Sequence, residues 1–179
     1  MRRLTILTMV VALTAWPHAE AGAASEVEAA EPVGQPSIST EPLAIVVNRS
    51  SPIEKLTFAE LRSIFLGNRS HWANGKRITL VMREPGDGER KTILREVCGM
   101  NEDQFKTLFL RGLYTGDILV SPKILSTPTG VRKFIFNVPG AIGYLRASDV
   151  DETVKVVRID ELLPGEKGYR LQVPTQPQN

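Results

Sequence analysis

The chain has 179 residues and carries 22 basic against 20 acidic residues, with one cysteine. The basic residues are scattered among acidic ones, which argues against a nucleic-acid or membrane-surface partner. One cysteine excludes an intramolecular disulfide, so an apolar core must hold the fold, and the length suits about one domain on the usual scale of about 100–200 residues.

The first 23 residues have the pattern of a cleavable signal peptide. Met1–Arg3 is basic, Leu4–Trp16 is uncharged and apolar, and small residues near Ala21 and Ala23 fit a cleavage site. The apolar run is shorter than the about 20 residues that span a bilayer, and no cysteine stands at the predicted cleavage region for lipid attachment. We expect export to the periplasm or the cell exterior, by general secretion rather than by the twin-arginine route, and no membrane span in the mature chain.

Composition divides the rest of the chain into three parts. Residues 24–42 are rich in Ala, Glu, Pro and Ser, which predicts a flexible leader. Residues 174–179 resemble them and predict a flexible tail. One compact domain is expected at 43–173.

The predicted elements follow in chain order. Leu43–Asn48 is a continuous apolar run, typical of a central strand buried on both faces. Thr57 and Glu60 form a capping-box pair at the start of a helix that Gly67 ends. Among the later segments, strands are predicted at 78–82, 141–145 and 153–157. Helices are predicted at 88–98, 101–112 and 127–138. This order predicts an α/β sheet with helices on its faces.

The loop from Arg83 to Arg90 is the candidate binding site. It reads Arg-Glu-Pro-Gly-Asp-Gly-Glu-Arg between a strand and a helix. Backbone N–H groups at a helix start, together with an arginine, form a frame for an oxyanion. The site residues expected to contribute are Arg83, Gly86, Asp87, Gly88, Glu89 and Arg90.

Acidic residues inside this frame favour a structural use of the loop. Asp87 is expected to cap the helix, and Glu89 to face the positive end of the helix dipole. Pairing with one of these acids is the favoured use of Arg83. Arg90 and Lys91 are expected to lie in solvent.

Other chemistry-bearing residues offer no second site. Trp72 lies in a turn-rich loop and is expected to pack rather than to stack on a ligand, and Cys98 to behave as a small buried hydrophobe. His71 is the only histidine after the predicted cleavage site, so no metal-ligand set is expected. Gly143 and Tyr144 are expected in the core. No catalytic motif appears, so we expect neither an enzyme nor a cofactor.

Several segments together resemble a known family. Val46–Asn48, the helix at 56–67, Trp72 with Gly75, the Arg83 loop and Pro139–Tyr144 resemble, in order, the phosphate-binding solute receptors of ABC importers. The similarity covers about residues 43–150 and is closer to short stand-alone proteins that carry part of such a receptor. It implies an α/β, single-lobe periplasmic-binding-protein-like domain, with a mostly parallel or mixed sheet flanked by helices.

The resemblance also identifies a departure in the loop. The family's loop reads Arg-x-x-x-Ser-Gly-Thr; Arg83 and Gly88 match it, whereas Asp87 and Glu89 replace the two hydroxyl residues. A carboxylate repels phosphate by about 3 kcal/mol at about 5 Å and an effective dielectric constant of about 20.

Two hypotheses follow. The first is an exported phosphate- or oxyanion-binding-like protein with weak or lost phosphate binding, whose site a second copy or an envelope protein completes. The alternative is a cell-envelope protein-interaction module with no small-molecule ligand.

Overall fold

The computed structural model of the protein describes residues 39–175. The predicted signal peptide, most of the predicted leader and the last four residues lie outside this part. Strand β1 (Thr40–Asn48) begins three residues before the predicted start of the domain, because its first residues pair with β8 (Gln172–Pro174). None of the helices in residues 39–175 has the length and apolar content that crossing a bilayer requires.

The main sheet is mixed, as predicted. Its order is β4-β3-β5-β1-β6, and β8 pairs with the first part of β1. Strand β1 is antiparallel to β5, β6 and β8, whereas β3 is parallel to β4 and β5. The bounds of the other strands are β3 Thr79–Arg83, β4 Lys123–Leu125, β5 Ala141–Arg146 and β6 Val154–Val156. A second, two-stranded parallel sheet joins β2 (Lys55–Leu56) to β7 (Arg158–Ile159).

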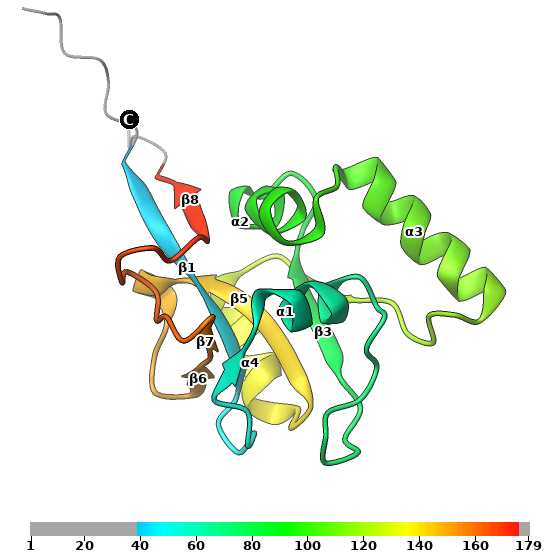
Figure 1. Cartoon of the computed structure of the whole chain (residues 1–179), viewed down its shortest axis with the longest axis horizontal. Helices are drawn as coiled ribbons and strands as arrows, with labels where there is room; N and C mark the ends of the chain where they lie inside the picture. Colours follow the sequence, from blue (N-terminus) through cyan, green and yellow to red (C-terminus); the bar gives the residue numbers. More distant parts are fainter. Residues whose placement is uncertain (1–38, 176–179) are drawn as a thin grey trace, which may run out of the picture. The chain divides into compact units, whose positions relative to one another are not determined.

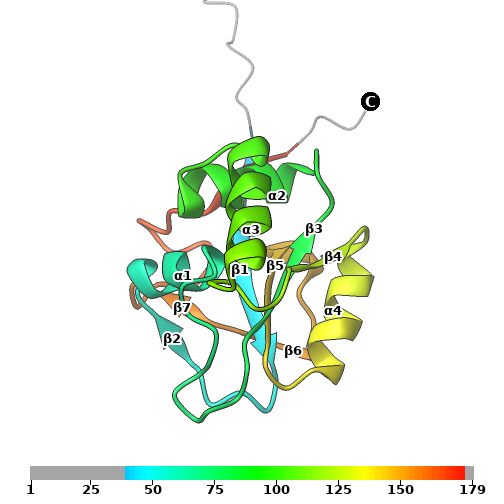
Figure 2. The same ribbon diagram turned by 90° about the vertical axis from the view of Figure 1, so that its right-hand side faces the viewer.

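Helices cover both faces of the main sheet (Figures 1 and 2). One face carries α1 (Phe58–Phe65), α2 (Gly88–Ile93) and α3 (Glu102–Thr115), and the other carries α4 (Pro128–Asn137). Helix α3 extends outward from the sheet and ends well away from α2 (Figure 1).

The apolar run in β1 is divided between these two layers. Leu43, Ile45 and Val47 belong to the core under α1 and α3, and Ala44 and Val46 to the core under α4. Successive strand side chains point to opposite faces, so a strand covered on both sides must be apolar at every position. The prediction of a central strand buried on both faces is confirmed.

The predicted helix starts are confirmed, and one predicted helix end is wrong. Capping boxes join Thr57 to Glu60 and Asn101 to Gln104. Gly112, however, does not end α3, which continues to Thr115 and stops at Gly116 in the left-handed conformation. Gly112 is small for another reason: a Cβ there would lie 2.6 Å from the side chain of Ile118, which packs against the helix.

The helix predicted at 88–98 changes type along its length. Helix α2 gives way to the π-helical turn η1 (Leu94–Cys98), and Gly99 ends it with φ +67°. Strands β4, β8 and the β2–β7 pair were not predicted. Each has only two or three residues, too few for a period-2 pattern.

Candidate functional site

The Arg83 loop joins the end of β3 to the start of α2. Gly86 has φ +93° in a turn that the Asp87 N–H closes on the carbonyl of Glu84, at 3.2 Å. Asp87 is the N-cap of α2, and its Oδ1 accepts from the Glu89 N–H at 3.0 Å. The predicted cap is therefore confirmed, and the free backbone donors at this helix start already face an internal carboxylate.

Arg83 is buried and lies beside both acids of the loop. Its Nη2 is 2.7 Å from Asp87 Oδ2, and its Nε is 3.7 Å from Glu89 Oε2. Its backbone N–H donates to the hydroxyl of Tyr144 at 3.0 Å, which ties the end of β3 to β5. The predicted pairing of Arg83 with the loop acids is confirmed.

Arg83 nevertheless keeps unused donors. Its Nε and Nη1 are buried and have no hydrogen-bond partner within residues 39–175. The contact of Nε with Glu89 is too long for a hydrogen bond. Buried donors without partners are uncommon and costly, so this guanidinium retains capacity for a further acceptor.

Glu89 joins the loop to a residue that the sequence did not single out, Arg146 at the end of β5. Arg146 Nε donates to Glu89 Oε1 at 2.7 Å, and Arg146 Nη1 to Glu41 Oε2 at 3.2 Å. Burial opposes the ionisation of Glu41, but hydrogen bonds from Ser148 and Arg146, with the charge of Arg146, outweigh it and lower its pKa. Side chains of alternating charge, Glu41, Arg146, Glu89 and Arg83, therefore connect β1 to the loop.

Arg90 is not in solvent, and that prediction is wrong. The residue is 4% exposed, and its Nη1 donates to the carbonyl of Arg83 at 2.8 Å. Its Nε and Nη2 donate hydrogen bonds to the carboxylate of Glu102, the first residue of α3, at 2.8 and 2.6 Å. Its guanidinium also lies over the Phe105 ring. Arg90 thus fixes the loop to α3. Lys91 is exposed, as predicted.

An open hollow of about 840 Å³ lies beside the loop. Its wall includes residues 86–89 and Arg146, with Lys91, Thr92 and Arg95 from the helix that follows. This volume is within the range of about 300–1,000 Å³ that is usual for ligand pockets. The loop, Arg146 and the hollow therefore form the candidate site, and Arg83 is joined to the wall of the hollow through Asp87 and Glu89.

The other singled-out side chains have structural roles. Trp72 is buried, and its Nε1 donates to the carbonyl of Gly140 at 3.1 Å, so the packing prediction is confirmed. Cys98 is fully buried, and burial raises the pKa of its thiol to about 12, despite the nearby charges of Arg62 and Arg90. His71 is exposed. Residues 39–175 hold no group of three or more metal-ligating side chains.

Comparison with known proteins assigns the chain to a family. The model of a PBP superfamily domain matches residues 11–176. The phosphate-binding protein PstS of Bacillus subtilis (strain 168) is 28% identical over 137 residues, which are 70% of this chain and 38% of PstS. The chain therefore spans well under half the length of that relative.

Solved structures share the fold. One, from Clostridium perfringens and described as a phosphate ABC transporter substrate-binding protein with bound phosphate, has a TM-score of 0.64 at 22% identity, covering 76% of this chain and 54% of its own. An ABC-type phosphate transport receptor from Vibrio cholerae has a TM-score of 0.59 at 21% identity, covering 76% of this chain and 55% of its own. The protein thus belongs to the PBP superfamily, and its α/β domain has the fold of phosphate ABC transporter substrate-binding proteins.

Proposed function

We propose that this protein is an exported, phosphate-binding-like solute-binding protein whose phosphate affinity is weak or lost. The observation that carries the proposal is the contact of Asp87 and Glu89 with Arg83. The relative named above is a phosphate-binding protein, and the two solved structures are a phosphate transporter substrate-binding protein with bound phosphate and a phosphate transport receptor. In this chain, internal carboxylates compete for the arginine on which phosphate binding would depend.

The local charge supports a weak site. Within this set of ion pairs two cations, Arg83 and Arg146, face three carboxylates, those of Asp87, Glu89 and Glu41. Lys91, Arg95 and Asp149 also line the hollow, outside these pairs. Each carboxylate repels a monoanion by about 3 kcal/mol at about 5 Å and an effective dielectric constant of about 20. An incoming phosphate must therefore displace at least one acid from an arginine or bind beside carboxylates that repel it.

The open shape of the hollow supports the same conclusion. The chain spans about half of the solved receptors that share its fold, and the hollow beside the loop is open. A ligand bound there would stay exposed to water on one side. We propose that any tight binding requires a second copy of this chain or an envelope protein to cover the hollow.

The test is the melting temperature of the protein against phosphate at low ionic strength, with chloride and sulfate as controls. A ligand at about 100 times its dissociation constant stabilises a native protein by about 2.7 kcal/mol, roughly 10 °C for a domain of this size. We expect little or no phosphate-specific rise at about 1 mM. A rise at micromolar phosphate would contradict the proposal.

A double variant tests the physical reason. Asp87→Ser with Glu89→Thr removes both loop acids, and serine keeps an oxygen that can cap α2. We expect a phosphate-specific rise in melting temperature and measurable binding by calorimetry. Glu84→Gln is the matched control, because Glu84 is an exposed acid of the same loop that makes no ion pair in the described part of the chain. Unchanged affinity in the double variant would refute the repulsion argument.

One observation favours the alternative, a cell-envelope interaction module without a small-molecule ligand. In the run Glu41–Arg146–Glu89–Arg83, carboxylates of the protein itself balance the charge of both arginines. The same titrations separate the two functions: if neither the natural chain nor the double variant gains stability from phosphate, the interaction module becomes the better description.

A further inference from the structure

Asn74 lies in the turn of the loop that leads into β3, and Gly75 follows it. It is the only asparagine in the sequence that precedes a glycine. The backbone nitrogen of the next residue can attack an asparagine side chain and close a five-membered ring, unless a side chain on that next residue hinders it. Glycine has no Cβ, and a Cβ built at Gly75 would meet nothing within 4 Å. The attack on Asn74 is therefore sterically open.

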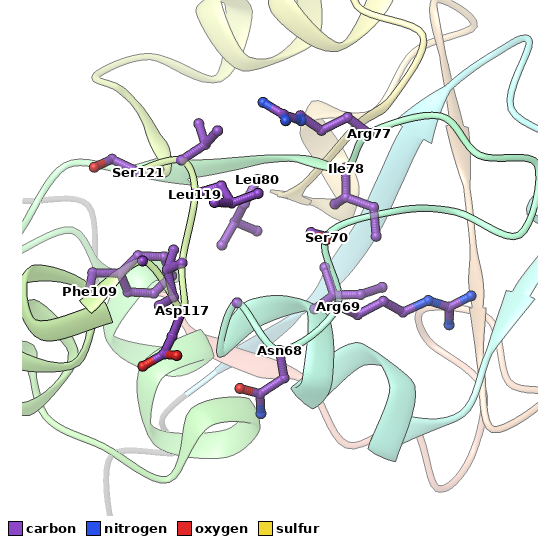
Figure 3. Close-up of a pocket in the computed structure, with 15 residues that line it drawn as sticks. Asn68, Arg69, Ser70, Arg77, Ile78, Leu80, Phe109, Asp117, Leu119 and Ser121 are labelled. Atoms are coloured by element: carbon purple, nitrogen blue, oxygen red, sulfur yellow. The ribbon is translucent and has the colours of Figure 1, made fainter. Parts of the chain in front are cut away.

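The turn that carries Asn74 is accessible to water, because residues 73–77 are exposed. The two ends of the loop lie closer to the rest of the domain: Ser70 at its start and Arg77 at its end line a small pocket beside β3 (Figure 3). Asn74 does not belong to that pocket. Hydroxide and water, which the reaction requires, can therefore reach its side-chain amide.

A backbone hydrogen bond holds the Asn74 side chain in place for the reaction. Its Oδ1 accepts from the Lys76 N–H at 3.1 Å. This bond ties the side chain to the backbone one residue beyond the attacking nitrogen of Gly75 and limits rotation away from it. Negative charge develops on Oδ1 as the ring closes, and a backbone donor already bound to this atom stabilises that charge.

One contact in the turn opposes the reaction. The Gly75 N–H donates to the carbonyl of Trp72 at 2.9 Å, and this bond must break before the nitrogen attacks. Breaking one neutral hydrogen bond slows a reaction by about two- to thirteenfold. The Lys76 contact with Oδ1 acts in the other direction. The two contacts of the fold therefore leave Asn74 about as reactive as it is in a free peptide.

We propose that Asn74 is a modification site, at which the folded protein converts asparagine into aspartate and isoaspartate. The Gly75 nitrogen gives its proton to hydroxide and bonds to Cγ of Asn74. The bond between Cγ and Nδ2 then breaks, and this nitrogen takes a proton from water and leaves as ammonia. Water opens the ring at either of its two carbonyl groups, which yields the two products. No atom is oxidised or reduced, and the residue gains one negative charge.

This modification is separate from the candidate oxyanion site. The Asn74 loop precedes β3 (Thr79–Arg83) and the Arg83 loop follows it, so the two loops lie at opposite ends of one strand. Contacts outside the turn hold the base of the Asn74 loop: the Ile78 N–H donates to the carbonyl of Ser70 at 2.8 Å, and Trp72 Nε1 to the carbonyl of Gly140 at 3.1 Å. The modified protein should therefore keep its fold and its response to phosphate.

The test is peptide mapping by mass spectrometry of the natural chain after incubation in mildly alkaline buffer. Trypsin releases Asn74 in the peptide 70–76 and Asn68 in the peptide 63–69. Asn68 is the internal control, because it is also exposed but is followed by Arg69. The mass change from amide to acid, with separate aspartate and isoaspartate peaks, should develop at Asn74 at least about ten times faster than at Asn68.

Two comparisons separate the effect of the sequence from that of the fold. The synthetic peptide 70–76 lacks the contacts of the folded loop, and the folded chain should react within about tenfold of its rate. Gly75→Ala places a Cβ beside the attacking nitrogen and should slow the reaction at Asn74 at least about tenfold. Ala73→Ser is the matched control: it changes the exposed residue on the other side of Asn74 and should leave the rate unchanged.

Three results would overturn the proposal. They are equal rates at Asn74 and Asn68, an unchanged rate in Gly75→Ala, and a folded chain that reacts more than about ten times slower than the peptide. The last result would mean that the hydrogen bond from Gly75 to Trp72 protects the site.

Discussion

The contact between Arg90 and Glu102 yields the sharpest stability prediction. Glu102→Gln removes the negative charge that faces the Nε and Nη2 of Arg90, at 2.8 and 2.6 Å, and keeps the size of the side chain. Arg90 is buried and also holds the carbonyl of Arg83. The substitution therefore leaves a buried cation with a neutral partner, next to the candidate site.

The loss of stability expected for Glu102→Gln lies between two known limits. Breaking a fully buried ion pair costs about 3–5 kcal/mol, whereas an exposed pair contributes about 0.2–1 kcal/mol. The side chain of Arg90 is 5% exposed but that of Glu102 is 36% exposed, so water can partly replace the lost carboxylate. We expect a loss of about 2 kcal/mol, or a fall in melting temperature of roughly 6–10 °C.

The assay is thermal and urea unfolding at neutral pH, with Asp103→Asn as the control. Asp103 is the next residue of the same helix turn and is exposed. Both substitutions remove an acid near the positive end of α3, which contributes about 0.3–1 kcal/mol, so their difference isolates the Arg90 pair. Equal losses in the two variants would refute the assignment of Arg90 as the anchor of the loop.

Two further predictions test packing and titration. Gly140→Ala should lower the free energy of unfolding, measured in urea, by at least about 3 kcal/mol, because its Cβ would lie 2.0 Å from the carbonyl oxygen of Arg77. The control Gly75→Ala, which has open space around the new Cβ but a φ of +78°, should cost only about 1 kcal/mol. Equal costs would mean that the backbone yields at Gly140. Burial raises the pKa of Cys98 from 9.0 to about 12, so above about pH 9 the unfolded state releases a proton that the folded state keeps, and stability falls. Between pH 8 and pH 10 the free energy of unfolding should drop by about 1.4 kcal/mol more in the natural chain than in Cys98→Ala, and parallel pH profiles would contradict a buried thiol.

Local sequence patterns predicted much of the fold. The capping boxes at Thr57 and Asn101 depend on residues three positions apart, and the cap at Asp87 on residues two apart. The continuous apolar run of β1 likewise predicted a strand covered on both faces. These patterns succeed because the interacting groups are near neighbours in the chain, where backbone geometry fixes their separation.

The candidate site was only half predictable from the sequence. The sequence identified the Arg83 loop, its cap and the acids that face its arginine. It did not identify Arg146 as a partner of Glu89, because the two lie 57 residues apart, and it placed Arg90 in solvent because a charged residue near a helix start is usually exposed. No local signal distinguishes such an arginine from its neighbour Lys91.

The sequence by itself therefore determined the order of the helices and of the longer strands, most helix starts and the conflict between an anion-binding frame and its acids. Only the tertiary structure decided which charges meet: β5 places Arg146 against Glu89, and the start of α3 places Glu102 against Arg90. The physical reason is that an ion pair requires proximity in space, and sheet order and helix packing bring together side chains whose separation along the chain carries no periodic signal.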